Sequence, residues 1–282
     1  MKFYKIKSYA KINISLGVLG KLKSKLHKIE SLISFLNLYD EIFIKKIKNK
    51  NHKLIFTGKF SKRISKNNTI SKLLKILDNN NKLRNQKYLI KVNKKIPQKS
   101  GMGGGSMNAA HILKYLSNKQ KLNLSSKEIL RIASKIGSDV VVGMQNKTSI
   151  LYGSGEIKLL KKNINLFTLL ARPNSGCSTK AIYRDVRYFS RPVFKKNQRV
   201  NLNYKFLIKL KNDLEEPAFK KYPVLKKLKI FMEKMDDILF VRMTGSGSTI
   251  IGYFISKKAA VNARKILKKK YQKYWCILSK TI

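Results

Sequence analysis

The sequence predicts an α+β protein built from two domains. Its 282 residues are 43% hydrophobic, which is sufficient for one large core or two modest ones. Residues 88–96 alternate apolar and polar side chains as a strand does, and residues 106–116 place apolar side chains at helical spacing. The segment 238–270 reads as strand, glycine turn, strand and helix, which is the expected ending of a small α+β domain.

The division into two domains follows from a change in sequence character near 155–165. It predicts an N-terminal domain over residues 1–157 and a C-terminal domain over residues 158–282. A short buried strand is expected near the start of the second domain, at 167–171.

The chain begins with strand-like residues at 3–18, which include the run Ala10-Lys11-Ile12-Asn13. Strand side chains alternate between faces, so Lys11 and Asn13 share a face and could line a polar cleft. In a chain this rich in lysine and asparagine, a solvated strand face is an equally good interpretation. The apolar segment that follows, from Ser31, is expected to turn at Asp40-Glu41.

A glycine-rich stretch, PQKSGMGGGSMNAA at 97–110, lies between a predicted strand and a predicted helix. Backbone N–H groups and the positive end of the helix dipole converge there, and residues without a Cβ let an anion approach the main chain. The dinucleotide fingerprint fails because position 106 is serine, and the Walker pattern fails because no lysine follows Gly105. The sequence predicts a phosphate-binding loop of another type, with a ligand-free glycine turn as the alternative.

Two helices flank this loop in the sequence. Residues 68–77 predict a helix capped by Asn68 or Thr69, and Ser125 with Glu128 forms a capping box that opens a helix ending at Gly137. Asp139 follows and is expected at a helix-to-strand junction, with the valines after it in a strand. An acid held on rigid elements near a phosphate loop is a candidate catalytic group, and a turn-forming aspartate is the alternative.

Cysteine content and hydropathy exclude several classes of protein. Cys177 and Cys276 are the two cysteines, and they show no metal-binding spacing, so neither a disulfide framework nor a structural zinc site is expected. No apolar run reaches about 18 residues, which excludes a membrane span. The basic start lacks the features of a secretory signal, so the expected compartment is the cytoplasm.

Lys+Arg 63 against Asp+Glu 14 gives a net charge of +49, a balance that ordinarily suggests nucleic-acid binding. The lysines are spread along the whole chain and accompany abundant asparagine and isoleucine. We interpret this as the composition of a protein from an AT-rich bacterial genome, and we expect no specific nucleic-acid partner. A basic nucleic-acid-binding protein remains the alternative.

Four blocks, taken together and in order, resemble the GHMP small-molecule kinases over nearly the whole chain. The blocks are Ala10 to Asn13, the loop 97–110 with its GGGSxNAA ending, Gly137-Ser138-Asp139-Val140 followed by Gly155-Glu156, and Asn212-Asp213-Leu214-Glu215 with Met243 to Gly247. The first and last blocks are most similar to the branch that phosphorylates a cytidine diphosphate-linked polyol in the non-mevalonate isoprenoid pathway. A kinase of the homoserine or mevalonate type is the alternative within the family.

The resemblance implies a reaction and its residues. ATP would phosphorylate the 2-hydroxyl of the polyol, with Asp139 accepting the hydroxyl proton and Lys11 as the cation beside it. Asn13 and His27 would hydrogen-bond the cytidine end of the substrate, and Tyr183 would stack on the cytosine. The residues implied to bind the nucleotide are Pro97, Gly101, Gly103, Gly104, Gly105, Ser106 and Asn108. Mg²⁺ is the implied metal, and its ligands remain open.

The implied fold is the two-domain GHMP kinase fold with its active-site cleft between the domains. A small-molecule substrate, no membrane partner and a monomer or weak dimer are expected. The sequence departs from the family pattern at several places: Lys25-Leu26 replaces glycine and tyrosine before the histidine, Gln98-Lys99-Ser100 stands where glycines are common, Met107 replaces a second serine, and Val141 replaces a proline after Asp139. Altered base stacking and altered ATP binding are the expected consequences.

Overall fold

The computed structural model describes residues 2–22, 26–120, 122–196 and 200–282. The chain divides into two compact units, which are described separately. The stretches of unit 1 are Met1–Lys11, Leu38–Gln98 and Gly103–Asn146, and those of unit 2 are Ile12–Asn37, Lys99–Met102 and Lys147–Ile282. The domain boundary predicted between residues 157 and 158 stays a prediction.

Unit 1 contains a sheet whose longest strand is β3 (His27–Ile47), which begins in unit 2. Strand β5 (Lys87–Asn93) pairs with β3 in antiparallel fashion and with β4 (Lys53–Thr57) in parallel fashion. Strand β1 (Tyr4–Asn13) also pairs with β3. The prediction of a strand before the glycine loop is therefore confirmed.

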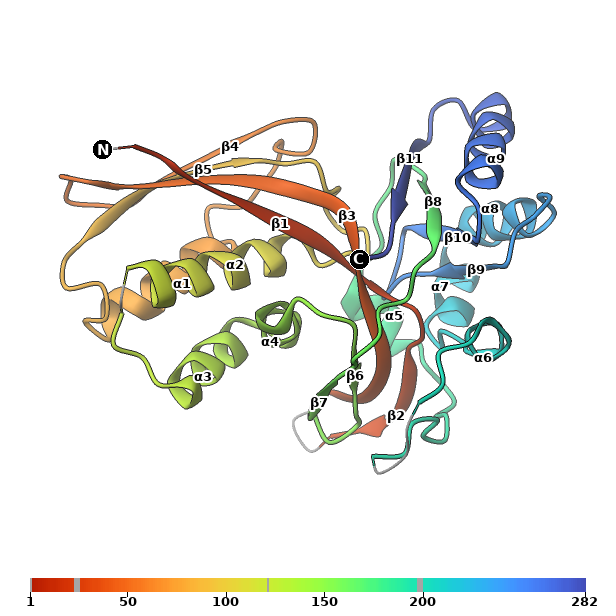
Figure 1. Ribbon diagram of the computed structural model, residues 1–282, viewed down its shortest axis with the longest axis horizontal. Helices are drawn as coiled ribbons and strands as arrows, with labels where there is room; N and C mark the ends of the chain where they lie inside the picture. The colour runs from red at the N-terminus through yellow and green to blue at the C-terminus, as the bar shows by residue number, and fades with distance from the viewer. Residues whose placement is uncertain (1, 23–25, 121, 197–199) are drawn as a thin grey trace. The chain divides into compact units, whose positions relative to one another are not determined.

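Four helices of unit 1 lie on one side of these strands (Figure 1). They are α1 (Thr69–Asn79), α2 (Gly104–Lys119), α3 (Ser126–Ile136) and α4 (Ser138–Gln145). Their apolar faces form one core with the inward side chains of β3 and β5. Ile42 of β3, Ile90 of β5 and Leu113 of α2 are fully buried in this core. Burial of these apolar faces is what holds the four helices against the sheet.

The predicted helix starts are confirmed by their caps. Asn68 accepts hydrogen bonds from the backbone N–H groups of Ile70 and Ser71, and Ser71 completes a capping box. Ser125 and Glu128 form the second capping box, at the start of α3. These contacts span three residues or fewer, which is why the sequence revealed them.

Two local predictions were wrong. Strand β3 continues through Asp40-Glu41 without a turn, because Asp40 occupies an inward position of the alternating pattern and is fully buried among hydrogen-bond donors. The valines after Asp139 belong to helix α4, where Val140 and Val142 are buried. Tertiary packing overrides the β-propensity of valine here, so Asp139 lies in the first turn of a helix.

Unit 2 contains a four-stranded antiparallel sheet in the order β11-β8-β10-β9. The strands are β8 (Phe167–Arg172), β9 (Phe240–Met243), β10 (Ile250–Phe254) and β11 (Trp275–Lys280). The helices of this unit are α5 (Thr179–Arg184), α6 (Tyr204–Lys209), α7 (Glu215–Lys221), α8 (Pro223–Glu233) and α9 (Lys257–Lys270). Three short strands belong to the sheet that contains β3. Strand β2 (Gly17–Lys21) pairs with β3. Strand β6 (Ser149–Leu151) lies between β3 and β7 (Ile157–Leu159) and pairs with both.

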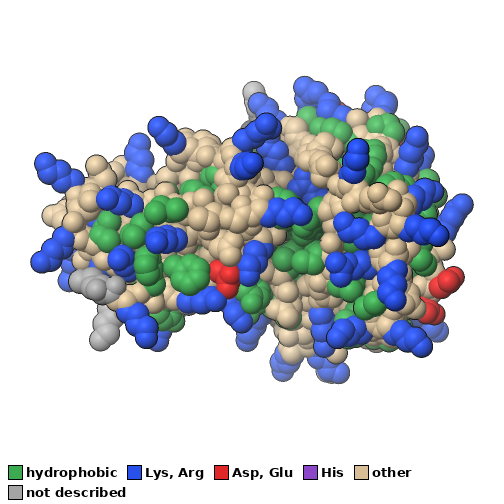
Figure 2. Space-filling view, turned by 90° about the horizontal axis from the view of Figure 1, so that it is seen from above, with side chains coloured by type: hydrophobic (Ala, Val, Ile, Leu, Met, Phe, Trp, Pro, Cys, Tyr) green, Lys and Arg blue, Asp and Glu red, His purple; other side chains and the backbone are tan. Residues whose placement is uncertain are grey.

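The core of unit 2 lies between its sheet and helices α7 to α9, with Leu169, Leu225, Leu228 and Leu267 fully buried. The predicted strand, turn, strand and helix over 238–270 are all present. Lysine and arginine side chains are distributed over the face seen in Figure 2 and do not gather in one patch. Among the described residues, no helix combines the length and the apolar character needed to cross a bilayer.

Candidate functional site

Lys11 and Asp139 form an ion pair in unit 1, as the sequence predicted that they would be neighbours. The Lys11 ammonium Nζ lies 3.1 Å from the Asp139 carboxylate Oδ1. Strand β1 carries the lysine, whose side chain is only 6% exposed, and the first turn of α4 carries the aspartate, which is 42% exposed. The carboxylate is therefore open to a solute on one side while a buried cation fixes it on the other.

Gly103 brings the glycine loop against this ion pair. Its φ of +63° is in the left-handed region that favours glycine. A Cβ at this position would lie 3.1 Å from Lys11 Cγ and 3.5 Å from Asp139 Oδ2. The absence of a side chain at residue 103 thus lets the loop backbone approach both charged groups.

Helix α2 starts at the end of this loop, with Gly103 at its N-cap. Because glycine has no side chain, the N-cap supplies no acceptor for the first amide groups of the helix. Gly104, Gly105 and Ser106 form the first turn, in which Gly105 is exposed and Ser106 half-buried. Such a helix start favours an anion, since its amides and its dipole both present positive charge.

The two ends of the predicted nucleotide set are buried. Pro97 opens the loop and is buried, and Asn108 lies one turn into α2 with 1% of its surface exposed. Asn108 Nδ2 donates a hydrogen bond of 3.0 Å to the buried carboxylate of Asp40. Asn108 therefore acts inside the unit, underneath the loop.

The start of α1 also contacts the start of α2, which the sequence did not indicate. The Thr69 hydroxyl donates a 2.6 Å hydrogen bond to the carbonyl oxygen of Gly105. The N-terminal turns of two helices therefore meet within unit 1, beside the glycine loop. Thr69 was predicted only as one of two alternative caps, and its longer-range contact left no local signal.

These features fit the phosphates of a nucleotide. The glycine positions provide close backbone approach, and the helix start provides amide donors. Among the described residues no group of three or more His, Cys, Asp or Glu side chains is placed to hold a metal ion. Mg²⁺ bound with a nucleotide usually takes phosphate oxygens and water as most of its ligands.

In unit 2, Gly101 and Asn13 contact one turn, Thr244 to Gly247. The Thr244 hydroxyl donates to the Gly101 carbonyl at 3.2 Å and accepts from the Asn13 backbone N–H at 3.0 Å. A Cβ on Gly101 would lie 2.0 Å from the Thr244 carbonyl oxygen, so no other residue fits there without a backbone shift. The Asn13 side chain donates a 2.8 Å hydrogen bond to the Ser31 hydroxyl.

Asn212 explains why the two parts of the fourth sequence block, Asn212 to Glu215 and Met243 to Gly247, occur together. Its side-chain amide donates to the carbonyl oxygens of Met243 and Gly245, at 2.7 and 2.8 Å. Its Oδ1 accepts from the N–H of Leu214 at 3.0 Å. One buried side chain thus holds the glycine turn that contacts Gly101 and Asn13.

His27 and Tyr183 lie together in unit 2, with ring centroids 5.1 Å apart and planes inclined by 38°. The Nε2 atom of His27 is buried and has no hydrogen-bond partner among the residues that the structure describes. Burial lowers the pKa of His27 below its ordinary value of 6.5, and the positive charge of Lys21 lowers it further. A neutral imidazole beside an aromatic ring suits a planar, polar ligand group.

Three of the residues that depart from the family pattern, Leu26, Ser100 and Met107, have different environments. Leu26 is 66% exposed, and Ser100 is buried. The Met107 side chain is fully buried and packs toward α4, where its Cε would lie 2.9 Å from a Cβ on Gly143. Residue 107 therefore contributes to the core of unit 1 and does not present a side chain to the outer surface of the loop.

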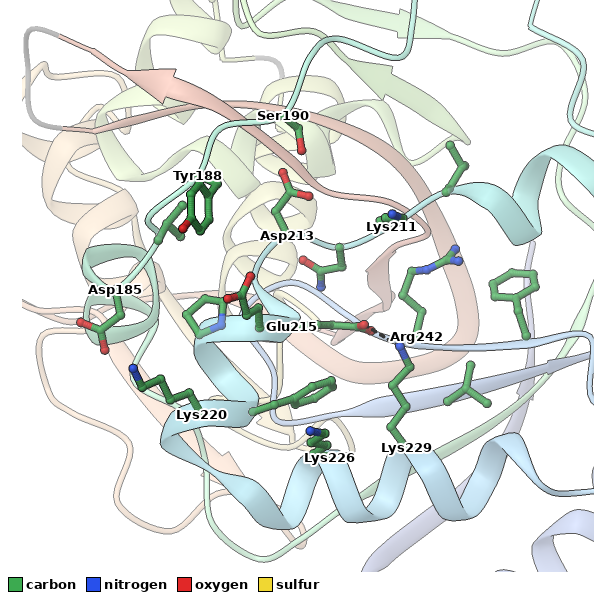
Figure 3. Close-up of a pocket in the computed structure, with 18 of the residues that line it drawn as sticks. Asp185, Tyr188, Ser190, Lys211, Asp213, Glu215, Lys220, Lys226, Lys229 and Arg242 are labelled. Carbon is green, nitrogen blue, oxygen red and sulfur yellow. Dashed lines mark hydrogen bonds and ion pairs between the residues drawn. The ribbon is translucent and has the colours of Figure 1, made fainter.

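A separate hollow of about 1880 Å³ lies wholly in unit 2 (Figure 3). Its charged groups are engaged in structural contacts. Glu215 accepts from Lys229 and from the Met243 N–H, each at 2.7 Å, and the Arg242 guanidinium donates to backbone carbonyl oxygens, including that of Ile14 at 2.9 Å. None of the site residues predicted from the sequence lines this hollow.

Comparisons with known proteins agree with the sequence blocks. A family model described as the GHMP kinases N terminal domain matches residues 68–154, and one described as GHMP kinases C terminal matches residues 197–273. A 4-diphosphocytidyl-2-C-methyl-D-erythritol kinase from Pelagibacter ubique is 52% identical over 282 residues, which cover 100% of both chains. A kinase with the same name from Thermoanaerobacter pseudethanolicus is 32% identical and covers 100% of this chain and 97% of its own.

Solved structures share the fold. The crystal structure of a 4-(cytidine 5'-diphospho)-2C-methyl-D-erythritol kinase matches with a TM-score of 0.78 at 22% identity, covering 99% of this chain and 100% of the other. A homoserine kinase from Cytophaga hutchinsonii matches with a TM-score of 0.67 at 16% identity, covering 100% and 95%. These two likenesses concern the chain fold alone.

Proposed function

The chain belongs to the GHMP kinase family, and we propose that it is a 4-diphosphocytidyl-2-C-methyl-D-erythritol kinase. It phosphorylates the 2-hydroxyl of that substrate with ATP, in a step of isoprenoid precursor biosynthesis. The observation that carries this conclusion is the 52% identity to the Pelagibacter kinase over the full length of both chains. The homoserine kinase likeness supports the fold only, so it does not favour a homoserine substrate.

Asp139 is proposed as the general base. Its partly exposed carboxylate accepts the proton of the substrate hydroxyl, which raises the nucleophilicity of the attacking oxygen. Lys11, whose ammonium lies 3.1 Å from that carboxylate, stabilises negative charge on the attacking oxygen and on the transferring phosphoryl group. The ion pair also keeps Asp139 in one position before the substrate arrives.

The glycine loop is proposed to receive the phosphates of ATP, which supplies the phosphoryl group. Backbone amides of Gly103, Gly104 and Gly105 and the hydroxyl of Ser106 are the donors available at the helix start. Mg²⁺ is the expected metal ion and would neutralise phosphate charge, with Ser106 available to it as an oxygen ligand.

Asn13, His27 and Tyr183 are proposed to recognise the cytidine end of the substrate. The unpartnered Nε2 of His27 and the neighbouring Tyr183 ring support this assignment, since cytosine offers both hydrogen-bonding edges and a flat face. The cytoplasm is the proposed compartment, and a monomer or weak dimer is the proposed assembly.

A coupled assay of ADP release tests the proposed function. The purified protein is given ATP and Mg²⁺ with each of three alcohols: 4-diphosphocytidyl-2-C-methyl-D-erythritol, homoserine and mevalonate. Turnover is expected with the first alone. A protein that turned over homoserine or mevalonate and ignored the cytidylyl compound would belong to another branch of the family.

A further inference from the structure

Asp40 is a fully buried carboxylate in unit 1 that accepts hydrogen bonds from four donors. Its Oδ1 accepts from the backbone N–H groups of Lys95 and Ile96, at 2.7 and 2.9 Å. Its Oδ2 accepts from the Lys94 ammonium and from Asn108 Nδ2, the latter at 3.0 Å. Both carboxylate oxygens are therefore in use, and none of these donors belongs to the element that carries Asp40.

These donors come from both ends of the glycine loop. Lys95 and Ile96 immediately precede Pro97 and lie beyond the end of β5 at Asn93, where the sheet no longer supplies partners for their N–H groups. Asn108 lies one turn into α2, near the C-terminal end of the stretch 97–110. One side chain in the middle of β3 thus fixes the residues where the loop leaves the sheet and where it enters the helix.

The ion pair with Lys94 balances the charge of Asp40. The Lys94 side chain is 5% exposed, and its Nζ would lie 3.3 Å from a Cβ on Gly104, directly beneath the first residue of α2. An uncompensated ammonium at this place would oppose the positive end of the helix dipole. A buried ion pair adds little to stability compared with an apolar pair of the same volume, so its presence calls for a geometric explanation.

We propose that Asp40 is a positioning residue that holds both ends of the glycine loop, and that Lys94 serves it by neutralising its charge. The loop thereby keeps the shape in which its amides meet the phosphates of a nucleoside triphosphate. This inference rests on the proposed function in one respect, the assignment of a nucleoside triphosphate as the ligand of the loop. Asp40 itself touches neither substrate nor nucleotide.

Two double variants separate hydrogen bonding from charge. Asp40→Asn with Lys94→Met removes both buried charges and keeps an oxygen for the Lys95 and Ile96 amides. The new amide nitrogen can donate to Asn108 Oδ1 after the Asn108 amide rotates, since this buried oxygen has no partner within the described part of the chain. Asp40→Ala with Lys94→Met removes the same charges and all of the hydrogen bonds.

ATP binding is measured by calorimetry without the alcohol substrate, and hydrogen exchange is followed in the peptide that covers residues 94–108. The asparagine double variant is expected to bind ATP within about twofold of the wild type. The alanine double variant is expected to lose about tenfold or more in ATP affinity and to exchange faster at Lys95 and Ile96. Its KM for the alcohol should change less than its KM for ATP.

Equal ATP affinities in the two double variants would overturn the inference, whether both match the wild type or both are weak. Circular dichroism and melting temperature are measured on both variants, and affinities are compared at a temperature at which both are folded. A wild type that binds ATP but turns over none of the three alcohols would refute the proposed function and leave this inference standing. A wild type that binds no ATP would refute the inference.

Discussion

Gly103 and Asp139 show how much of the site depends on single residues. Gly103 leaves room that the Lys11 stem and the Asp139 carboxylate occupy, and its left-handed φ is available to few other residues. Asp139 reaches that room from the first turn of α4. A substitution that changes the side-chain volume little, Asp139→Asn or Gly103→Ala, should therefore be enough to lower the activity.

Asp139→Asn is expected to lower kcat by about 100- to 10,000-fold, because an amide cannot accept the hydroxyl proton. The volume and the fold should be preserved, since the side chain is partly exposed. Steady-state kinetics with circular dichroism of the same sample measure both effects. A variant with more than a tenth of wild-type kcat would exclude Asp139 as the general base.

Gly103→Ala is expected to lower both stability and activity. An alanine in the left-handed region costs about 1–2 kcal/mol, and its Cβ, 3.1 Å from Lys11 Cγ, would push the lysine stem aside by a few tenths of an ångström. A displacement of about 1 Å at a reacting group can cost about 100-fold in rate, so this smaller shift of Lys11 should lower kcat by about tenfold or less. Urea unfolding measures the loss of stability, and steady-state kinetics measure the loss of kcat.

Gly155→Ala is the matched control for this strain. Gly155 also has a positive φ, +86°, but a Cβ there meets nothing within 4 Å. The control should lose a similar amount of stability and keep its kcat. Equal losses of kcat in the two variants would mean that steric displacement of the ion pair is not the cause.

At the scale of elements, the position of Asp139 depends on how closely α4 packs on α2. Gly143 in α4 faces Ala110 and Met107 of α2, and a Cβ on Gly143 would lie 2.7 Å from Ala110 Cβ. The buried Met107 side chain fills the neighbouring space. Methionine, where the family usually has a serine, therefore contributes at residue 107 to the packing of α2 against α4.

Gly143→Ala is expected to lower the free energy of unfolding by about 1–2 kcal/mol. Overpacking costs about 1–3 kcal/mol, and the 2.7 Å approach to Ala110 Cβ places this site in the upper part of that range, so the cost exceeds the gain of about 1 kcal/mol in helix propensity. Gly137→Ala, where a Cβ meets nothing within 4 Å and the backbone is extended, should change stability by less than about 0.5 kcal/mol. Urea denaturation compares the two variants, and a Gly143→Ala protein as stable as the wild type would show that α2 and α4 separate freely.

The α3 capping box predicts a pH dependence. The hydrogen bond from Lys82 and those from Ser125 lower the pKa of Glu128 from 4.5 to about 2. A carboxyl with a lowered pKa in the folded state stabilises the protein fully above pH 4.5 and loses this contribution as the pH falls toward 2. The stability difference between the wild type and Glu128→Gln should therefore shrink over that range.

Thermal unfolding at pH 7, 4 and 2.5 measures this difference. Because Glu128 is at the surface, added salt should also reduce it. A difference that stayed constant between pH 7 and 2.5 would show that the Glu128 carboxylate contributes through something other than its charge.

At the scale of the whole molecule, the net charge of +49 predicts attraction to polyanions without a defined site. Figure 2 shows the basic side chains dispersed over the viewed face. Binding to a single-stranded oligonucleotide should fall steeply between about 0.02 and 0.15 M salt, because counterion release drives it. Fluorescence anisotropy measures the decline, and tight binding that persisted at 0.15 M salt would indicate a specific nucleic-acid surface.

The sequence by itself determined the family, the proposed reaction and most of the elements. The helix caps at Asn68 and Ser125 could be predicted because their hydrogen bonds join residues three positions apart or fewer. The blocks around Lys11, the glycine loop and Asp139 were recognisable because their residue types and order are constrained by the chemistry. These signals are local, or they depend on order along the chain.

Tertiary structure alone decided which residues meet. It placed Asp139 in a helix, because the packing of α4 outweighs the strand preference of three valines. It also brought Asp40 to Lys94 and Asn108, which lie 54 and 68 positions away along the chain. An aspartate at the end of an apolar segment predicts a turn when only its sequence neighbours are considered. Its burial is favourable only once distant donors surround it, and the fold is what supplies those donors.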